Sequence, residues 1–315
     1  MDIKHVLNTK QFLNEDLLVD IFKKADTFEK QDRENSVPKV LDGKVLACIF
    51  YEPSTRTRLS FESAMLKLGG GVISTESAGY FSSAIKGETL EDSIKVIADY
   101  SDAIVLRHPE TKSAERAAQV SSVPIINAGD GGEEHPTQAL LDLYTIRKEI
   151  GRTDNIKVAL VGDLLHGRTI HSLVYLLAMK ENVEIFFVSP KELEIPESYK
   201  EFLKSKNIKF SEFSDLSQVV SQADILYMTR IQQERFSDKK IYEKVKDCFV
   251  LTKDMLSELK KEARIMHPLP RVKEIGPEID KDERAAYFRQ ARNGLYLRMA
   301  LLSFLLEQDD RPLND

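Results

Sequence analysis

A cluster of hydroxyl and guanidinium groups lies at Ser54-Thr55-Arg56-Thr57-Arg58, directly after an apolar run and before a helical pattern. Hydroxyl and guanidinium groups donate hydrogen bonds to anions, and arginine adds a full positive charge. A helix that begins within 54–57 would add unpaired N–H groups and a partial positive charge. The stretch therefore predicts a phosphate-binding turn. The alternative is an ordinary helix cap, because Ser and Thr are favoured caps, but capping accounts for only one hydroxyl.

Groups of a similar kind follow several other apolar runs of the chain. They are Arg107-His108-Pro109 after 103–106, His135-Pro136-Thr137-Gln138 after 123–128, Asp163 and His166-Gly167-Arg168-Thr169 after 157–162, Thr229-Arg230-Ile231-Gln232 after 223–228, and His267-Pro268-Leu269-Pro270-Arg271 after 264–267. Taken singly, each group also fits a plain turn or a solvated strand end. Their joint placement favours a binding site, because parallel sheets bind ligands outside the carboxyl ends of their strands. A set rich in arginine, histidine and hydroxyls suits a small, multiply anionic ligand.

The apolar runs that precede these groups predict strands. They are continuous rather than alternating, which is typical of strands buried on both faces of a parallel sheet. The predicted strands cover residues 45–50, 103–106, 123–128, 157–162, 183–188, 223–228, 248–251 and 264–267. Helical patterns lie between them, such as 169–180. Alternating strands and helices predict an α/β fold with right-handed crossovers.

The length of 315 residues indicates two domains. A long helical pattern at 136–151 lies between two groups of strands and ends in Gly151, a favoured C-terminal cap. We predict two doubly wound α/β domains, each with a central parallel sheet flanked by helices, joined by this long interdomain helix. The last helical pattern, 295–308, is predicted to return to the first domain. The predicted domains are 1–135 with about 290–315, and 136–289.

Composition narrows the class of protein. The net charge is −6, which argues against nucleic-acid binding, since that needs a basic domain or stripe. No run approaches the roughly 18 apolar residues of a membrane span, and the N-terminus lacks a signal-peptide pattern. Cys48 and Cys248 form no disulfide framework, and no histidine or cysteine spacing indicates a metal site. We therefore expect a cytoplasmic protein without metal or cofactor, in which Cys48 is an ordinary core residue.

The motifs STRTR, RHP, HPTQ, GRT, MTR-x-Q and HPLPR, in this order and spacing, resemble the catalytic chain of the aspartate carbamoyltransferases. The resemblance covers nearly the whole sequence. Members of this family transfer the carbamoyl group of carbamoyl phosphate to the amino group of L-aspartate. The products are N-carbamoyl-L-aspartate and phosphate, and the reaction belongs to pyrimidine biosynthesis. The resemblance implies the same reaction here.

The resemblance also implies roles for residues of the first predicted domain. The residues implied to hold phosphate are Ser54, Thr55, Arg56 and Thr57. Those implied to meet the carbamoyl group are Arg107, His135 and Gln138, with Arg107 also reaching phosphate. Thr57, Arg107 and His135 would polarise the carbonyl oxygen. The implied catalytic residues are Arg56, Thr57, Lys86, Arg107 and His135.

Residues of the second predicted domain are implied to bind aspartate. Arg168 and Arg230 would hold its two carboxylates, helped by Thr169 and Gln232. The backbone carbonyls of Pro268 and Leu269 would contact the amino and carbamoyl nitrogens. The resemblance further implies a cis peptide bond between Leu269 and Pro270.

The stretch 75–93 carries small residues and little apolar periodicity, and by itself it is typical of a surface loop. In the family, the positions of Ser82 and Lys86 reach the active site of a neighbouring subunit. The resemblance therefore implies a homotrimer with shared active sites. Some members of the family also bind a separate zinc-bearing regulatory chain and others act as bare trimers, so the resemblance allows either.

Two other functions are alternatives to carbamoyl transfer to aspartate. Ornithine carbamoyltransferases share the phosphate-binding half, but they carry His-Cys-Leu-Pro where this chain has His267-Pro268-Leu269-Pro270. Arg168 and Arg230 also suit a dicarboxylate better than a side chain that ends in an ammonium group. A non-catalytic phosphate-binding subunit would be marked by a degraded site, and the motifs here are intact.

Overall fold

The computed structural model describes residues 3–78, 87–131, 134–232, 236, 239–246 and 248–307. The chain forms two compact units. Unit 1 consists of Met1–Leu140 and Arg292–Asp315, and unit 2 of Leu141–Ala291. The chain enters unit 2 inside helix α6 (Pro136–Ile150) and leaves it inside helix α11 (Tyr287–Leu306). The boundaries stated from the sequence, 1–135 with about 290–315 and 136–289, stay a prediction.

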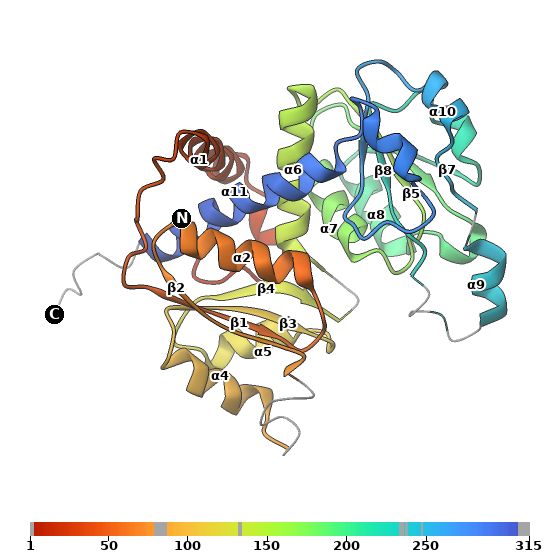
Figure 1. The fold of residues 1–315 in the computed structure, drawn as a ribbon. Coiled ribbons are helices and arrows are strands. Elements are labelled where there is room, and N and C mark those ends of the chain that lie inside the picture. The colour runs from red at the N-terminus through yellow and green to blue at the C-terminus, as the bar shows by residue number, and fades with distance from the viewer. Residues whose placement is uncertain are drawn as a thin grey trace. The chain divides into compact units, whose positions relative to one another are not determined.

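Unit 1 is built on a parallel sheet in the order β2-β1-β3-β4. The strands are β1 (Val45–Phe50), β2 (Gly71–Glu76), β3 (Ala103–His108) and β4 (Ile125–Asp130). Helix α2 (Thr55–Lys67) covers one face of the sheet, and α4 (Leu90–Ala98) and α5 (Ser113–Val120) cover the other (Figure 1). The unit also contains η1 (Thr9–Phe12) and α1 (Glu15–Arg33). Since both faces are covered, the central strands β1 and β3 are apolar except at the carboxyl end of β3, which carries Arg107 and His108.

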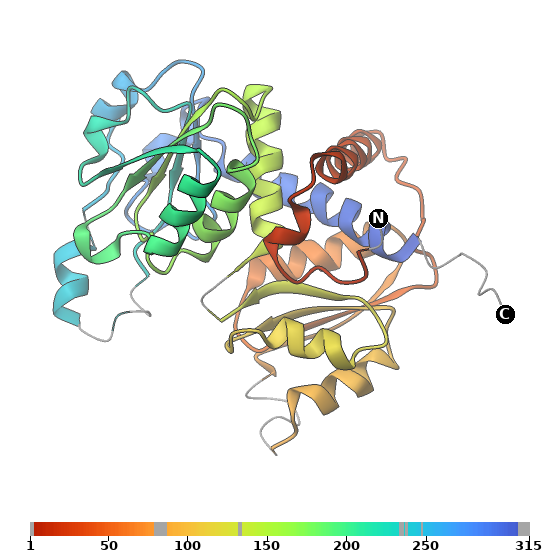
Figure 2. The ribbon, with the colours of Figure 1, turned by 180° about the vertical axis from the view of Figure 1, so that it is seen from behind.

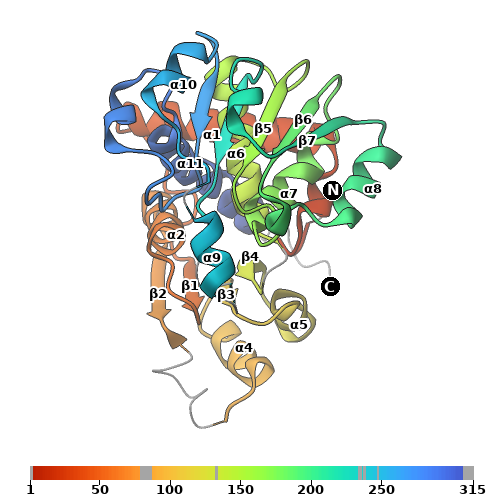
Figure 3. The same ribbon diagram turned by 90° about the vertical axis from the view of Figure 1, so that its right-hand side faces the viewer.

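Unit 2 is built on a parallel sheet in the order β7-β6-β5-β8-β9. The strands are β5 (Lys157–Val161), β6 (Glu184–Val188), β7 (Lys209–Phe213), β8 (Ile225–Met228) and β9 (Arg264–Met266). The helices are α7 (Arg168–Leu177), α8 (Glu197–Ser205), α9 (Lys239–Val245) and α10 (Lys253–Glu258), with short turns η3 (Lys191–Leu193), η4 (Leu216–Gln218) and η6 (Pro277–Lys281). Figures 2 and 3 show α7 beside α8, where the Tyr175 and Phe202 rings meet edge to face with centroids 4.8 Å apart.

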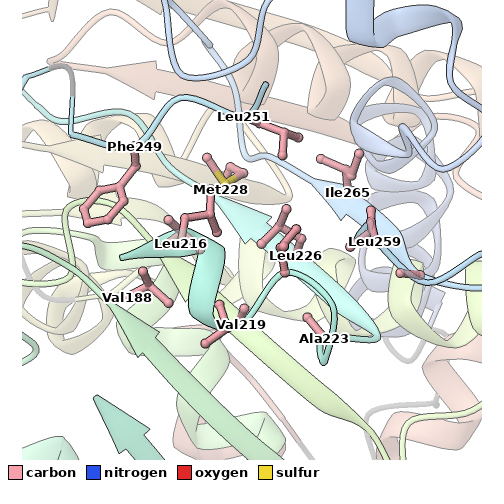
Figure 4. Close-up of a cluster of buried hydrophobic side chains, with 14 of the residues drawn as sticks. Val188, Leu216, Val219, Ala223, Leu226, Met228, Phe249, Leu251, Leu259 and Ile265 are labelled. Atoms are coloured by element: carbon pink, nitrogen blue, oxygen red, sulfur yellow. The ribbon is translucent and has the colours of Figure 1, made fainter. Parts of the chain in front are cut away.

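A buried apolar cluster fixes the second sheet against its connections (Figure 4). Strands β6, β8 and β9 contribute Val188, Leu226 and Ile265. Val219 and Leu251, from the segments that link the strands, complete the cluster. Burying each side chain of this size contributes about 1.5–3 kcal/mol to stability, so the cluster holds the strand ends in a fixed register.

The predicted fold class is confirmed: each unit has a central parallel sheet flanked by helices, and a helix lies at the C-terminal end. One predicted strand was wrong. Residues 248–251, all of which are described, form no strand, and Leu251 makes only an isolated bridge to Ile275. Helix α11 begins at Tyr287, earlier than the predicted 295.

The prediction that Cys48 is a core residue is confirmed. Cys48 is fully buried in β1, as predicted for a core residue, and burial raises the pKa of its thiol. No described helix is both long enough and apolar enough to cross a membrane.

Candidate active site

Each sheet has a point where the strand order reverses. In unit 1 the chain passes from β1 to β2 on one side, and β3 then pairs with the other side of β1. In unit 2 the chain passes outward from β5 through β6 to β7, and β8 then pairs with the other side of β5. Open α/β sheets bind ligands at this reversal, outside the carboxyl ends of the strands. The polar groups predicted from the sequence lie at or just after the ends of β1, β3 and β4 in unit 1 and of β5, β8 and β9 in unit 2.

Helix α2 begins at Thr55, with Ser54 as its N-cap residue. The Ser54 side chain makes no capping hydrogen bond within this helix, so the ordinary capping role is not the one it fills. Thr57 is buried, whereas Thr55 and Arg56 are exposed on the first turn. The start of α2 therefore presents the positive end of a helix together with a hydroxyl and a guanidinium group. That combination is an anion-binding site in chemical terms.

The two arginines of this turn have different surroundings. Arg58 forms ion pairs with Glu62, at 2.9 Å, and with Glu76 of β2, at 3.2 Å. Glu76 also accepts a hydrogen bond from the Ser54 N–H group, at 3.3 Å. Arg58 thus ties the beginning of α2 to the end of β2, and Arg56 is the arginine that faces solvent.

Arg107 joins the two strands that flank the reversal in unit 1. It lies in β3 opposite Phe50 of β1, and its guanidinium donates to the Ser54 hydroxyl at 3.4 Å. The same group lies 3.5 Å from the Glu52 carboxylate and 3.4 Å from the Ala128 carbonyl oxygen. These contacts hold the guanidinium beside the start of α2, as the sequence predicted for two residues at neighbouring strand ends.

His135 precedes helix α6 and is buried. Its carbonyl oxygen accepts hydrogen bonds from the N–H groups of Gln138, at 3.0 Å, and Ala139, at 3.1 Å. These bonds form the first turn of α6 and fix the position of the histidine relative to Gln138. Both residues follow β4, which is the neighbour of β3 in the sheet.

In unit 2 the loop after β5 is organised by Asp163, whose side chain is fully buried. Asp163 accepts hydrogen bonds from the His166 N–H group, at 2.9 Å, and the His166 ring, at 3.1 Å. It also accepts one from the Gln232 N–H group, at 3.4 Å, and the Gln232 side chain donates to the His166 carbonyl oxygen, at 3.2 Å. The loops after β5 and β8 are therefore joined directly.

Two arginines lie at the reversal point of unit 2. Arg168 is the first residue of α7 and Thr169 the second, so both lie at the positive end of the helix. Arg230 follows β8 directly after Thr229, whose hydroxyl donates to the Val161 carbonyl oxygen at 2.9 Å. A pair of cationic groups beside a helix N-terminus suits a ligand with two carboxylates.

Gly162 lies where β5 meets Thr229, and we predict that it tolerates no side chain. Its φ is +117°, and a Cβ there would lie 2.6 Å from the Thr229 hydroxyl oxygen. Backbone strain alone is expected to lower the free energy of unfolding of Gly162→Ala by about 1–3 kcal/mol, as measured by urea denaturation. Gly151→Ala is the matched control, because its φ is +75° but no described heavy atom lies within 4 Å of a Cβ. An equal loss of unfolding free energy in Gly162→Ala and Gly151→Ala would contradict a role for the contact with Thr229.

The turn after β9 has the cis peptide bond that the family resemblance implied. The Leu269–Pro270 peptide bond is cis, and Leu269 has a φ of +55°. Pro268 and Leu269 are partly exposed. Residues 267–270 are called the His-Pro-Leu-Pro turn below.

Some predicted residues cannot be placed. Ser82 and Lys86 lie outside the described residues. Sequence reasoning also missed residues that support the site, namely Glu52, Glu76 and Glu274. The sequence places Asp163 and His166 just after a predicted strand, but it gives no sign of the contact between them. Among the described residues, no group of three or more His, Cys, Asp or Glu side chains gathers as a metal site.

Family models match both halves of the chain. The model described as "Aspartate/ornithine carbamoyltransferase, carbamoyl-P binding domain" matches residues 4–148. The model described as "Aspartate/ornithine carbamoyltransferase, Asp/Orn binding domain" matches residues 154–305. Together they span nearly all of the described residues.

Individual proteins are similar over almost the whole chain. An aspartate carbamoyltransferase catalytic subunit of Methanocaldococcus jannaschii is 51% identical over 98% of this chain and 99% of its own length. A chloroplastic aspartate carbamoyltransferase of Arabidopsis thaliana is 52% identical over 97% of this chain and 78% of its own length. A solved structure of the M. jannaschii catalytic subunit superposes with a TM-score of 0.91 at 50% identity, covering 98% of this chain and 100% of the other. An aspartate transcarbamoylase of Trypanosoma cruzi, solved with carbamoyl phosphate and aspartate, gives a TM-score of 0.91 at 37% identity and 96% coverage of both chains.

Proposed function

The chain belongs to the aspartate/ornithine carbamoyltransferase family, and from this premise we propose how its residues divide the work of the reaction. It transfers the carbamoyl group of carbamoyl phosphate to the amino group of L-aspartate, giving N-carbamoyl-L-aspartate and phosphate. In unit 1, the start of α2 holds the phosphate group through Ser54, Thr55, Arg56 and Thr57. Arg107 reaches both the phosphate and the carbamoyl oxygen. The support for these roles is the helix N-terminus and the contact of Arg107 with Ser54.

Catalysis on this side rests on electrostatic stabilisation. Attack by the amine nitrogen on the carbonyl carbon places negative charge on the carbonyl oxygen, which Thr57, Arg107 and His135 are positioned to receive. The bond from that carbon to the phosphate oxygen then breaks, and charge moves to the phosphate group beside Arg56. The departing phosphate accepts the proton that the amine loses. Fixed donors aimed at developing charge are the largest single contribution in many enzymes.

The observation that carries the aspartate assignment is the pair of arginines at the reversal point of unit 2. We propose that Arg168 and Arg230 each bind one carboxylate of aspartate, with Thr169 and Gln232 as further donors. The carbonyl groups of Pro268 and Leu269 accept hydrogen bonds from the amino and carbamoyl nitrogens. An ornithine side chain, which ends in an ammonium group, would be repelled by the same two guanidinium groups.

We also propose a homotrimer in which Ser82 and Lys86 complete the site of a neighbouring copy. Exposed apolar side chains on unit 1, including Leu59 at 46% and Ile73 at 41%, give such an assembly apolar surface to bury. Both cysteines are free thiols, which is consistent with a reducing compartment such as the cytoplasm. Whether a zinc-bearing regulatory chain joins the trimer is answered by sizing the particle with and without such a chain.

The test is an assay for ureido products on the purified chain. Carbamoyl phosphate is supplied with L-aspartate in one reaction and with L-ornithine in the other. Product with aspartate alone is expected. Product with ornithine would transfer the assignment to the ornithine branch of the family. If neither reaction gives product although the particle is a trimer, the chain is a binding subunit.

A further inference from the structure

His267, the first residue of the His-Pro-Leu-Pro turn, is held by hydrogen bonds to both ring nitrogens. Nδ1 accepts a hydrogen bond from the Leu269 N–H group, at 2.8 Å. Nε2 lies 2.9 Å from Oε1 of Glu274. An Nδ1 that accepts carries no proton, so the proton of the neutral ring is on Nε2, and Nε2 donates to the carboxylate. The two bonds together specify one tautomer and one ring orientation.

Glu274 is itself fixed by backbone donors. Its Oε1 accepts from the Val272 N–H group and its Oε2 from the Lys273 N–H group, both at 3.1 Å. Burial acts to raise the pKa of Glu274, but the bonds from His267 and the backbone outweigh it, so the pKa lies below its ordinary value. The carboxylate is therefore ionised near neutral pH, and it is a strong acceptor for the His267 ring.

A second chain of bonds holds the backbone of His267. Its N–H group donates to the Gln290 side-chain oxygen at 2.8 Å. The Gln290 side-chain nitrogen donates to Asp142 at 2.6 Å, and Asp142 also accepts from the Tyr227 hydroxyl at 2.6 Å. Asp142 and Tyr227 are fully buried and Gln290 is 1% exposed. Buried and satisfied networks of this kind keep one geometry, because every alternative leaves a polar group without a partner.

The turn needs such support because Leu269 has an unfavourable backbone conformation. A residue with a side chain at a φ of +55° is in the left-handed region, and it persists there only when its surroundings hold it. The bond from the Leu269 N–H group to His267 is part of what holds it. The direction of the Pro268 and Leu269 carbonyl groups depends on this backbone.

We propose that Glu274 and Asp142 are positioning residues for carbamoyl transfer: each acts on His267, Glu274 through its ring and Asp142 through Gln290, and so fixes the Pro268 and Leu269 carbonyl groups. This inference rests on the proposed function, in which those carbonyl groups bind the reacting nitrogens. Neither Glu274 nor Asp142 touches substrate. Their effect falls on the amino and carbamoyl nitrogens and spares the phosphate group, because the whole network lies in unit 2 and the residues proposed to bind phosphate lie in unit 1.

The kinetic test compares Glu274→Ala, Glu274→Gln and the control Glu278→Ala, in which an exposed glutamate of the same unit is removed. Misplaced contacts of this kind cost about 10²-fold in rate, so Glu274→Ala is expected to lower kcat/KM for aspartate by about that factor. Binding of inorganic phosphate, measured by calorimetry, is expected to stay within about twofold of wild type, because the residues proposed to hold phosphate lie in unit 1. Glu274→Gln keeps an oxygen that accepts from His267, so it is expected to recover most of the loss. Glu278→Ala is expected to match wild type.

A second measurement reads the tautomer directly. In protein labelled with ¹⁵N-histidine, long-range ¹H–¹⁵N spectra of the wild type are expected to show His267 protonated on Nε2 and unprotonated on Nδ1. The signals are assigned by their loss in His267→Gln. In Glu274→Ala the preference for the Nε2 proton is expected to weaken. This readout stays decisive if Glu274→Ala fails to fold, because the wild type alone must show the stated tautomer.

The outcomes separate this inference from the function on which it rests. A wild-type trimer that makes no N-carbamoyl-L-aspartate overturns the proposed function and the inference with it. A wild type that is active, with a folded Glu274→Ala of unchanged kcat/KM, overturns the inference alone. A wild-type His267 that carries its proton on Nδ1 also overturns it. Loss of affinity for inorganic phosphate in Glu274→Ala would indicate general damage to the protein rather than positioning.

Discussion

Replacing Arg56 by alanine is expected to lower kcat for carbamoyl transfer by about 10²–10³-fold, while the protein stays folded. Arg56 is the exposed guanidinium of the first turn of α2, where Arg58 is already engaged with Glu62 and Glu76. Its charge therefore adds to the helix N-terminus at the point where the phosphate group gains negative charge. Because the side chain is exposed, its removal leaves no cavity in the core.

The measurement is steady-state kinetics with saturating aspartate, together with circular dichroism and thermal unfolding of the same preparations. Lys23→Ala is a suitable control, since Lys23 is an exposed cationic residue of α1 in the same unit. It is expected to leave both turnover and stability near wild type. Arg56→Lys keeps the charge but loses the planar guanidinium, so an intermediate rate is expected. Near-normal turnover in Arg56→Ala would remove this residue from the phosphate-binding role.

Much of the fold could be predicted because buried parallel strands leave a clear pattern. Val45–Phe50 is apolar along its whole length and forms β1 at the predicted positions. The two strands that were missed, β2 and β7, lie at the sheet edges and are largely exposed, so neither is a continuous apolar run. Residues 248–251 show the opposite error, since Phe249 and Leu251 of this apolar run are buried without joining the sheet. Apolar character reports burial, and burial does not require strand pairing.

The part of the candidate site that could be predicted from the sequence is the set of polar residues at the ends of strands. Arg107 lies at the end of β3 in unit 1 and Arg230 follows β8 in unit 2. The rule that parallel sheets bind ligands outside the carboxyl ends of their strands makes each of them a candidate. The residues that hold them carry no such signal. Glu76 lies on an edge strand beyond α2, and Gln290 reaches His267 from a distant helix. Such contacts arise from packing between segments far apart in the sequence, which no local pattern records.

A second large effect is expected for aspartate binding when Arg230 is replaced by alanine. Hydrogen bonds to charged groups each contribute about 1.5–3 kcal/mol, and a guanidinium that binds a carboxylate makes two of them. The loss of kcat/KM for aspartate is therefore expected to reach at least about 10²-fold. Arg168 remains at the start of α7, so one carboxylate is still bound and some activity survives.

The location of Arg230 predicts that its replacement affects aspartate and leaves carbamoyl phosphate binding unchanged. This difference tests the proposed role of Arg230 more strictly than the loss of activity alone. Arg230 lies in unit 2, whereas every described residue proposed to bind the phosphate group of carbamoyl phosphate lies in unit 1. Calorimetry is therefore expected to give wild-type affinity for carbamoyl phosphate alone, with the loss confined to aspartate kinetics. Arg152→Ala, which removes an exposed arginine from the same unit, is expected to change neither quantity. Weakened binding of carbamoyl phosphate in Arg230→Ala, or unchanged aspartate kinetics, would contradict the division of the two substrates between the two units.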